Sequence, residues 1–331
     1  MGYAKEKQKV EKQIKKIWRI VFLIVGVVSL GVMVFSCFYP METWKYYFAK
    51  PKLQARQEDE LRIHFVDVGQ GDATIIELPD GKIMLIDGGN DSEETAKKVM
   101  RYLNALKIDV IDYLVVTHAD EDHCGSLDKV LKYKEVKKAF VPVGSVTDST
   151  AYGEFFAALL KEDCEWEFSR RELDLSVFGE TGYTLKFLYP YTYDVEQEVE
   201  METNDSSCVI WLDYQGASAL FTGDAPFETE EKLTRDFQLG LLPKDVELSS
   251  TEILKVSHHG SRYATSAEFI KFLGVETAVI SCGENNAYQH PSSEVLENLN
   301  QNSVCIYRTD KEGNILLTLS KSGEYTAETL R

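Results

Sequence analysis

The sequence lacks the short motifs that mark several common enzyme classes. It has no Gly-x-Ser-x-Gly segment, which disfavours an α/β-hydrolase serine nucleophile, and no Walker A loop, which argues against a P-loop nucleotide site. Gly69-Gln-Gly71 begins like a dinucleotide-binding fingerprint, but the third glycine is missing. The residues that follow, Thr74 to Leu78, are typical of a strand rather than a helix, so we predict a hairpin here.

Cysteine is scarce, and its spacing is irregular. The 331 residues include six cysteines, of which Cys37 lies in an apolar segment and the others form no Cys-x-x-Cys pair. An odd number of cysteines at irregular spacing argues against a disulfide framework in the remainder of the chain. Cys124 is predicted to be a small buried packing residue rather than a ligand.

Basic residues are also in short supply outside the N-terminus. The chain has a formal net charge of −18, and its first forty residues carry seven basic against two acidic side chains, which leaves −23 for the rest. Proteins that bind long polynucleotides normally present a basic surface, because phosphate contacts dominate their affinity. Tight, extended DNA binding is therefore not expected, although the basic Lys255 and Arg262 flank the histidine pair His258-His259 and could attract a single phosphodiester there. The acidic segment from Tyr193 to Glu202 is predicted to be a solvated loop.

The N-terminus has the pattern of a membrane anchor. Residues 1–19 are basic and residues 20–39 are almost wholly apolar, a length that spans a hydrocarbon core of roughly 30 Å. We expect the basic flank to stay in the cytoplasm, residues 40–60 to form a linker, and residues 61–331 to form an exported domain. A cleaved signal is the alternative, but the apolar run is longer than such signals usually have, and Phe35 fits a lipoprotein cleavage site before Cys37 poorly.

Five apolar runs in the exported region each end on a carboxylate, an imidazole or a glycine-rich turn. Short β-rich runs bounded by glycine and polar residues are predicted to be buried strands. Ligand-type side chains at their ends would meet along one edge of a sheet, which is how a metal site is built from distant parts of a sequence. The runs are Lys82 to Asp87, Tyr113 to His118, Ala219 to Asp224, Ile253 to His259 and Ala278 to Gly283.

The segment His118-Ala-Asp120-Glu-Asp122-His123 is the densest group of metal-ligand residues. Imidazole nitrogen and carboxylate oxygen suit divalent transition metals, and on a turn after a strand the residues divide between two ions roughly 3.5–4 Å apart. The carboxylate of Asp224 would bridge the two ions, and His259 would complete the second site.

These motifs resemble those of metallo-β-lactamase-fold hydrolases, and the chain is most similar to the extracellular hydrolase domain of ComEC-type DNA-uptake proteins. The resemblance runs from about Leu61 to the end and implies an α/β fold, a four-layer αββα sandwich with two divalent metal ions at one sheet edge. It rests on Val68-Gly-Gln-Gly-Asp72-Ala, Leu85-Ile-Asp87-Gly-Gly, Thr117-His-Ala-Asp-Glu-Asp-His123, Asn204-Asp-Ser-Ser, Phe221-Thr-Gly-Asp224, Leu254-Lys-Val-Ser-His-His-Gly-Ser261 and His290-Pro.

The resemblance also implies roles for individual residues. One metal would be held by His118, Asp120 and either Asn204 or Asp205, with Asn204 favoured. The other would be held by Asp122, His123 and His259, although His258 could replace its neighbour as the ligand. Asp224 would bridge the ions, while Asp87 and Asp72 would lie behind the ligands.

Asp120 stands where the wider superfamily has histidine, and Asn204 near where it has another. Harder oxygen ligands weaken zinc binding at the first site and favour Mn²⁺ there, so either Zn²⁺ or Mn²⁺ is expected.

The predicted reaction is two-metal hydrolysis of a phosphodiester. Asp122, Asp224 and His258 are the predicted catalytic residues, with His258 either contacting the phosphate or protonating the leaving group. A second group of residues is predicted to contact the substrate phosphate, namely Ser261, Arg262 and His290.

Three functions remain open from the sequence. The first is a membrane-anchored, extracytoplasmic phosphodiesterase or nuclease linked to DNA uptake or processing. The second is a cell-wall phosphodiesterase that releases phosphocholine from teichoic acid, which the acidic surface suits and which aromatic side chains beside the metals would favour. The third is a non-catalytic binding module of the same fold. A β-lactamase is disfavoured by Asp120, and the sequence gives no oligomeric state.

Overall fold

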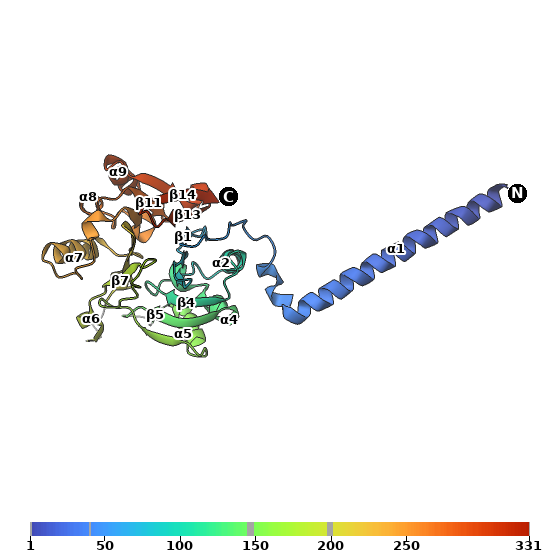
Figure 1. The fold of residues 1–331 in the computed structure, drawn as a ribbon, viewed down its shortest axis with the longest axis horizontal. Coiled ribbons are helices and arrows are strands. Elements are labelled where there is room, and N and C mark those ends of the chain that lie inside the picture. Colours follow the sequence, from blue (N-terminus) through green and yellow to red (C-terminus); the bar gives the residue numbers. More distant parts are fainter. Residues whose placement is uncertain (1, 40, 144–148, 197–200, 331) are drawn as a thin grey trace. The chain divides into compact units, whose positions relative to one another are not determined.

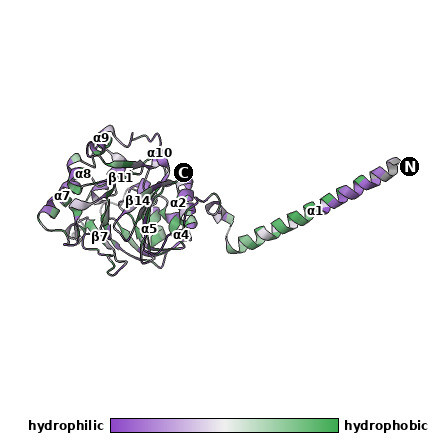
Figure 2. Cartoon of the chain, turned by 45° about the horizontal axis from the view of Figure 1, so that its top comes forward, coloured by the Kyte–Doolittle hydropathy of each residue, from purple (hydrophilic) through white to green (hydrophobic). Residues whose placement is uncertain are grey.

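The computed structural model describes residues 2–39, 41–143, 149–196 and 201–330. These belong to two compact units, Met1–Ala49 and Lys50–Arg331. The first unit consists of helix α1 (Gly2–Phe38) and the 3-10 turn η1 (Met41–Tyr46). Helix α1 is hydrophilic in its first part and hydrophobic in its second (Figure 2), and its segment Gln8–Phe38 is long and apolar enough to be a candidate membrane span.

The second unit contains two β-sheets. The first has eight strands in the order β14 (Tyr325–Leu330), β13 (Asn314–Leu319), β1 (Leu61–Phe65), β2 (Thr74–Glu77), β3 (Ile83–Ile86), β4 (Val110–Val115), β5 (Glu135–Val141) and β6 (Glu165–Phe168). The second has six strands in the order β12 (Cys305–Arg308), β11 (Thr277–Ile280), β10 (Ile253–Lys255), β9 (Ala217–Phe221), β8 (Val209–Tyr214) and β7 (Thr184–Tyr189). Both sheets are mixed.

The parallel parts of the sheets position the site. In the first sheet β3, β4, β5 and β6 run parallel, and in the second β9, β10, β11 and β12 do. Parallel strands end at the same edge of a sheet, which is where ligands bind in α/β folds. The chain therefore delivers the residues after β3, β4, β9, β10 and β11 to one region.

Two hydrophobic cores hold the layers together. One lies between the sheets and joins side chains such as Phe65 and Phe140 of the first sheet to Phe187 and Phe221 of the second. The other packs the second sheet against the helices α7 (Phe227–Gln238), α8 (Ala267–Leu273) and α9 (Ser293–Gln301). The predicted α/β sandwich of two sheets is confirmed.

Helices also lie beside the first sheet (Figure 1): α2 (Glu93–Ala105), α4 (Leu127–Tyr133) and α5 (Thr150–Leu159). Ser92 explains the start of α2, because its side chain accepts a hydrogen bond from the backbone N–H of Thr95. Between core motifs, α5 and β6 carry a small aromatic cluster of Tyr152, Phe155, Phe156 and Trp166.

The predicted loop from Tyr193 to Glu202 is wrong in part, because its first residues belong to the short helix α6 (Thr192–Glu196). Residues 197–200 of that prediction lie outside the described residues.

Candidate metal centre

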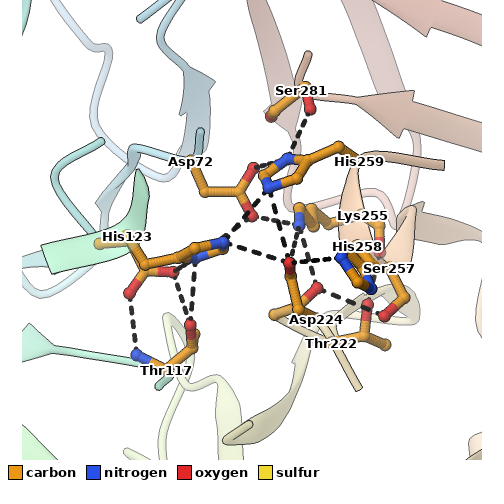
Figure 3. Close-up of polar contacts among 12 residues, drawn as sticks. Asp72, Thr117, His123, Thr222, Asp224, Lys255, Ser257, His258, His259 and Ser281 are labelled. Carbon is orange, nitrogen blue, oxygen red and sulfur yellow. Dashed lines mark hydrogen bonds and ion pairs between the residues drawn. The ribbon is translucent and has the colours of Figure 1, made fainter. Parts of the chain in front are cut away.

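The predicted ligands, and the two carboxylates predicted to lie behind them, come from segments that are far apart in the sequence. Asp72 lies in the β1–β2 hairpin, Asp87 follows β3, and His118 follows β4. The short helix α3 (Glu121–Cys124) carries Asp122 and His123; Asp224 follows β9, and His259 lies in the turn η4 (Ser257–Gly260) after β10. Asp72, His123, Asp224 and His259 face one another in Figure 3. The strand ends therefore converge as the sequence predicted.

Asp87 fixes the orientation of the histidines from the first sheet. Its backbone has a positive φ of 59°, and its Oδ2 accepts hydrogen bonds from His123 Nδ1 and from Thr117 Oγ1, both at 2.8 Å. The same Thr117 oxygen lies 3.1 Å from His118 Nδ1 and can accept its proton. Both histidines then carry their proton on Nδ1, which leaves each Nε2 with a free lone pair.

His259 is also held with its proton on Nδ1, by a carbonyl group that follows a strand of the second sheet. Its Nδ1 lies 2.9 Å from the carbonyl oxygen of Ser281, and its Nε2 lies 3.3 Å from His123 Nε2. Two unprotonated nitrogens at this distance repel each other unless a proton or a cation lies between them. The pair is thus arranged to share a cation.

Asp224 is the buried carboxylate that the imidazoles surround. Its Oδ1 is 3.2 Å from His123 Nε2, and its Oδ2 is 3.6 Å from His259 Nε2 and 3.9 Å from His118 Nε2. The backbone N–H of Asp224 donates to Ser207 Oγ at 3.1 Å, which fixes the turn. Burial alone would raise the pKa of Asp224, but the imidazoles of His123 and His259, when they carry a proton in place of a metal ion, hold it below its ordinary value.

These residues fit divalent metal ions. Ligand atoms of Asp72, His123, Asp224 and His259 all lie within 4.8 Å of one another, and the four side chains are buried. Among the described residues, His118 Nε2 and Asp224 Oδ1 are buried without a hydrogen-bond partner. Buried nitrogen and oxygen atoms without a hydrogen-bond partner are suitable ligand atoms for Zn²⁺ or Mn²⁺.

Asp120 and Asp122 extend the cluster on two sides. Asp120 Oδ2 lies 3.5 Å from His118 Nε2, and its side chain is 45% exposed. Asp122 Oδ2 lies 3.2 Å from His259 Nε2 and its side chain is more enclosed. Burial raises the pKa of Asp122, but the hydrogen bond that His259 donates when its Nε2 carries a proton in place of a metal ion outweighs burial and lowers that pKa. The two carboxylates thus face different imidazoles, as division between two ions requires.

His258 differs from its neighbour in position. Its Nε2 is 3.6 Å from Asp224 Oδ2, its side chain is 29% exposed, and burial lowers its pKa. It lines a cleft of about 320 Å³ together with Asp120, Glu202, Thr203, Asn204, Asp205, Pro226 and Tyr263. The buried Oδ1 of Asn204 has no hydrogen-bond partner among the described residues. The pKa of Asp205 is raised by burial. Asn204 and Asp205, the two alternative ligands predicted for the first metal, therefore line the same cleft.

The three residues predicted to contact the substrate differ in burial and in their distance from the histidines. The His290 ring packs 5.5 Å from that of His258 and 6.4 Å from that of His259, measured between centroids, and burial lowers its pKa to about 4. Ser261 is buried, and its Oγ accepts the backbone N–H of Tyr263. Arg262 is exposed.

The sequence did not predict the position of Lys255 inside the centre, and the pattern indicated only a basic residue that flanks it. Its side chain is 3% exposed; Nζ pairs with the carboxylate of Asp72, donates to the carbonyl oxygen of Gly223 at 3.1 Å, and lies 3.9 Å from Asp224 Oδ1. Burial opposes the charge, but Asp72 and Asp224 raise the pKa of Lys255. Its position in the apolar run Leu254-Lys-Val256 was the available signal for a buried lysine.

Comparison with known proteins gives a consistent result. The model of the metallo-beta-lactamase superfamily matches residues 66–284. ComE operon protein 3 of Bacillus subtilis is 30% identical over 77% of this chain and 33% of its own length. Competence protein ComA of Neisseria gonorrhoeae is 26% identical over 83% of this chain and 35% of its own length. The chain thus spans about a third of the length of these relatives. Their names confirm the resemblance to competence proteins.

Among solved structures, CmlA, a diiron beta-hydroxylase from Streptomyces venezuelae, aligns with a TM-score of 0.51 at 11% identity, covering 81% of this chain and 55% of its own. This likeness supports the fold alone.

Proposed function

Because the chain belongs to the metallo-beta-lactamase superfamily, we propose that it is a membrane-anchored phosphodiesterase that acts on nucleic acid outside the cytoplasm. The observation that carries the proposal is the convergence of three imidazole Nε2 atoms on the buried Asp224, beside a cleft of about 320 Å³. The similarity to competence proteins supports nucleic acid as the substrate and a link to DNA uptake or processing.

The residues divide into two ligand groups. His118, Asp120 and Asn204 would hold one ion, and Asp122, His123 and His259 the other, with Asp224 between them. Divalent ions bound there would supply Lewis acidity and make water nucleophilic near neutral pH. The chain's own contribution is orientation, because Asp87, Thr117 and Ser281 hold every Nε2 toward Asp224.

The open side of the centre would receive the phosphodiester. His258 is partly exposed beside Asp224, so it is the group placed to pass a proton to the leaving oxygen or to contact the phosphate. His290 packs against His258 and would approach the same phosphate. Arg262 is exposed on the same segment and is proposed as a further phosphate contact, whereas the buried Ser261 would act by supporting that turn.

The N-terminal unit would anchor the enzyme. The basic residues before the apolar part of α1 favour retention of that end in the cytoplasm, which would place the second unit outside. Such a protein would act at the cell surface.

The direct test uses the full chain in detergent. Metal content is measured by mass spectrometry, and hydrolysis of bis(p-nitrophenyl) phosphate is followed with Mn²⁺ or Zn²⁺. We expect close to two metals per chain and a loss of turnover of about a thousandfold in Asp122→Ala. The matched variant Asp213→Ala, half-buried on β8, is expected to keep activity. An Asp122→Ala variant with normal turnover would exclude this mechanism, and absence of both metal and turnover would favour a binding module.

A second candidate function follows from the lining of the cleft. Its lining includes Asp120, Glu202, Asp205 and the ring of Tyr263, with no lysine or arginine among the described residues that line it. Carboxylates and an aromatic face suit a cationic choline group. Faster hydrolysis of p-nitrophenylphosphorylcholine than of the p-nitrophenyl ester of thymidine 5′-monophosphate would favour the teichoic acid alternative.

A further inference from the structure

Lys255 is a fully enclosed cation beside the proposed metal ligands. It is the last residue of β10, and its ammonium joins the two sheets, because Asp72 comes from the β1–β2 hairpin and Gly223 from the turn after β9 (Figure 3). An ammonium has three N–H donors. Asp72 and Gly223 take two of them, and the third has Asp224 Oδ1 at 3.9 Å.

This arrangement argues against a direct role in holding the substrate. A lysine that binds phosphate must present free donors to the cleft, whereas the side chain of Lys255 is 3% exposed and its contacts are internal. Lys255 is also absent from the residues that line the cleft. Its effect on the centre must therefore act through Asp72 and Asp224.

The charges of the centre indicate what that effect is. Five carboxylates meet there, and three imidazoles with Nδ1 protonated add no charge. Two divalent cations would supply four positive charges, so one negative charge would remain uncompensated without Lys255 in a centre of which only Asp120 is strongly exposed. The carboxylates are those of Asp72, Asp87, Asp120, Asp122 and Asp224.

We propose that Lys255 is a positioning residue that supplies the fifth positive charge of the centre and keeps Asp72 from serving as a metal ligand. Asp72 is close enough to do so, because its ligand atoms belong to the same 4.8 Å cluster as those of His123, Asp224 and His259. Pairing with Lys255 holds Asp72 back and sets the number of divalent ions at two. The inference rests on the proposed metal centre, since it concerns how that centre is balanced.

Opposite charge changes should therefore have opposite effects on metal affinity. Lys255→Met removes a positive charge and frees Asp72, so Zn²⁺ should bind more tightly by roughly tenfold or more. Asp72→Asn removes a negative charge, so Zn²⁺ should bind more weakly by a similar factor. The double variant restores the balance and should lie within about threefold of the wild type, and Lys255→Arg should leave affinity nearly unchanged.

The experiment uses the full chain in detergent, with Zn²⁺ affinity measured by competition against a chromophoric chelator and stoichiometry by mass spectrometry. Weaker binding in both single variants would overturn the proposal, because a purely structural ion pair predicts it. An increase in KM of Lys255→Met with unchanged affinity would also overturn it, in favour of a substrate contact.

Folding of Lys255→Met gives a further test. Bound metal should replace the missing charge, so this variant is expected to fold at saturating Zn²⁺ even if the metal-free protein does not. Failure to fold with metal present would contradict the proposal. Failure of the proposed function is separate, because it would show as a wild-type chain that binds no metal or binds it without hydrolysis.

Discussion

Two regions of the second unit bury carboxylates and treat them differently. In the metal centre, Asp224 is surrounded by imidazoles and Lys255, and its pKa lies below the ordinary value. At the junction of α7 and α8, Glu230 is also buried, yet its carboxylate accepts hydrogen bonds from the backbone N–H groups of Thr265 and Ser266 and from the Ser266 side chain, and burial raises its pKa to about 7.

The two pKa shifts have opposite directions because the partners of the two carboxylates differ in charge. The ammonium of Lys255 and the protonated imidazoles stabilise the ionised form of Asp224, which is the form that coordinates a metal. Uncharged hydrogen-bond donors at the start of α8 compensate the burial of the Glu230 carboxylate only in part. The carboxylates with cationic partners are thus those that the site requires ionised.

The largest effect is expected from Asp224→Asn. This change removes the charge on which three imidazoles converge, so both ions should be lost and turnover should fall by at least about a thousandfold. Metal content and hydrolysis of bis(p-nitrophenyl) phosphate measure this. Asp236→Asn is the control, because it removes a buried carboxylate that pairs with Arg171 instead. If Asp236→Asn lost as much metal and turnover as Asp224→Asn, the special role of Asp224 in metal binding would be contradicted.

An effect on stability is expected at Glu230. Its pKa of about 7 in the folded state is above the ordinary 4.5, so its contribution to stability is complete below pH 4.5 and is lost as the pH rises through 7. Between pH 5 and 8 the wild type should lose up to about 3 kcal/mol more unfolding free energy than Glu230→Gln does.

Denaturant unfolding at several pH values tests this difference. Glu231→Gln changes an exposed neighbour on α7 and should keep the wild-type pH dependence. If Glu230→Gln shows the same pH dependence as the wild type, Glu230 is ionised throughout and the contrast with Asp224 is removed.

Much of the metal centre could be predicted from sequence, because its ligands directly follow apolar strands. His118, Asp224 and His259 each come after such a run, and parallel strands bring their ends to the same edge. The αββα fold was predicted through the family resemblance rather than from strand patterns. Those patterns identify strands but do not order them, and here the first sheet begins with β14 and β13 beside β1.

Contacts that cross between the sheets could not be predicted. The pairing of Lys255 with Asp72 depends on the register that places the end of β10 opposite the β1–β2 hairpin, and nothing local in either segment specifies it. His64 shows the same limit. Its two nitrogens lie 3.0 Å from Tyr102 Oη and from Glu77 Oε1 inside the fold, and the alternating pattern of its strand specifies neither contact.

The smallest effect that the comparison predicts is that of Thr117→Val, which alters the support of the ligands and none of the charges. The Thr117 hydroxyl donates to Asp87 and can accept from His118 Nδ1, so its loss leaves the tautomer of His118 unfixed. Metal affinity should fall by roughly 10- to 100-fold, as is usual when a ligand loses its supporting hydrogen bond. Thr251→Val removes a buried hydroxyl that bonds Leu248 and Trp211 away from the centre, and should leave metal affinity unchanged. Chelator competition on both variants decides the matter. If Thr117→Val binds metal with the affinity of the wild type, the charge of Asp224 is enough to orient the imidazoles. The hydrogen bonds of Thr117 would then contribute to folding stability and not to metal binding.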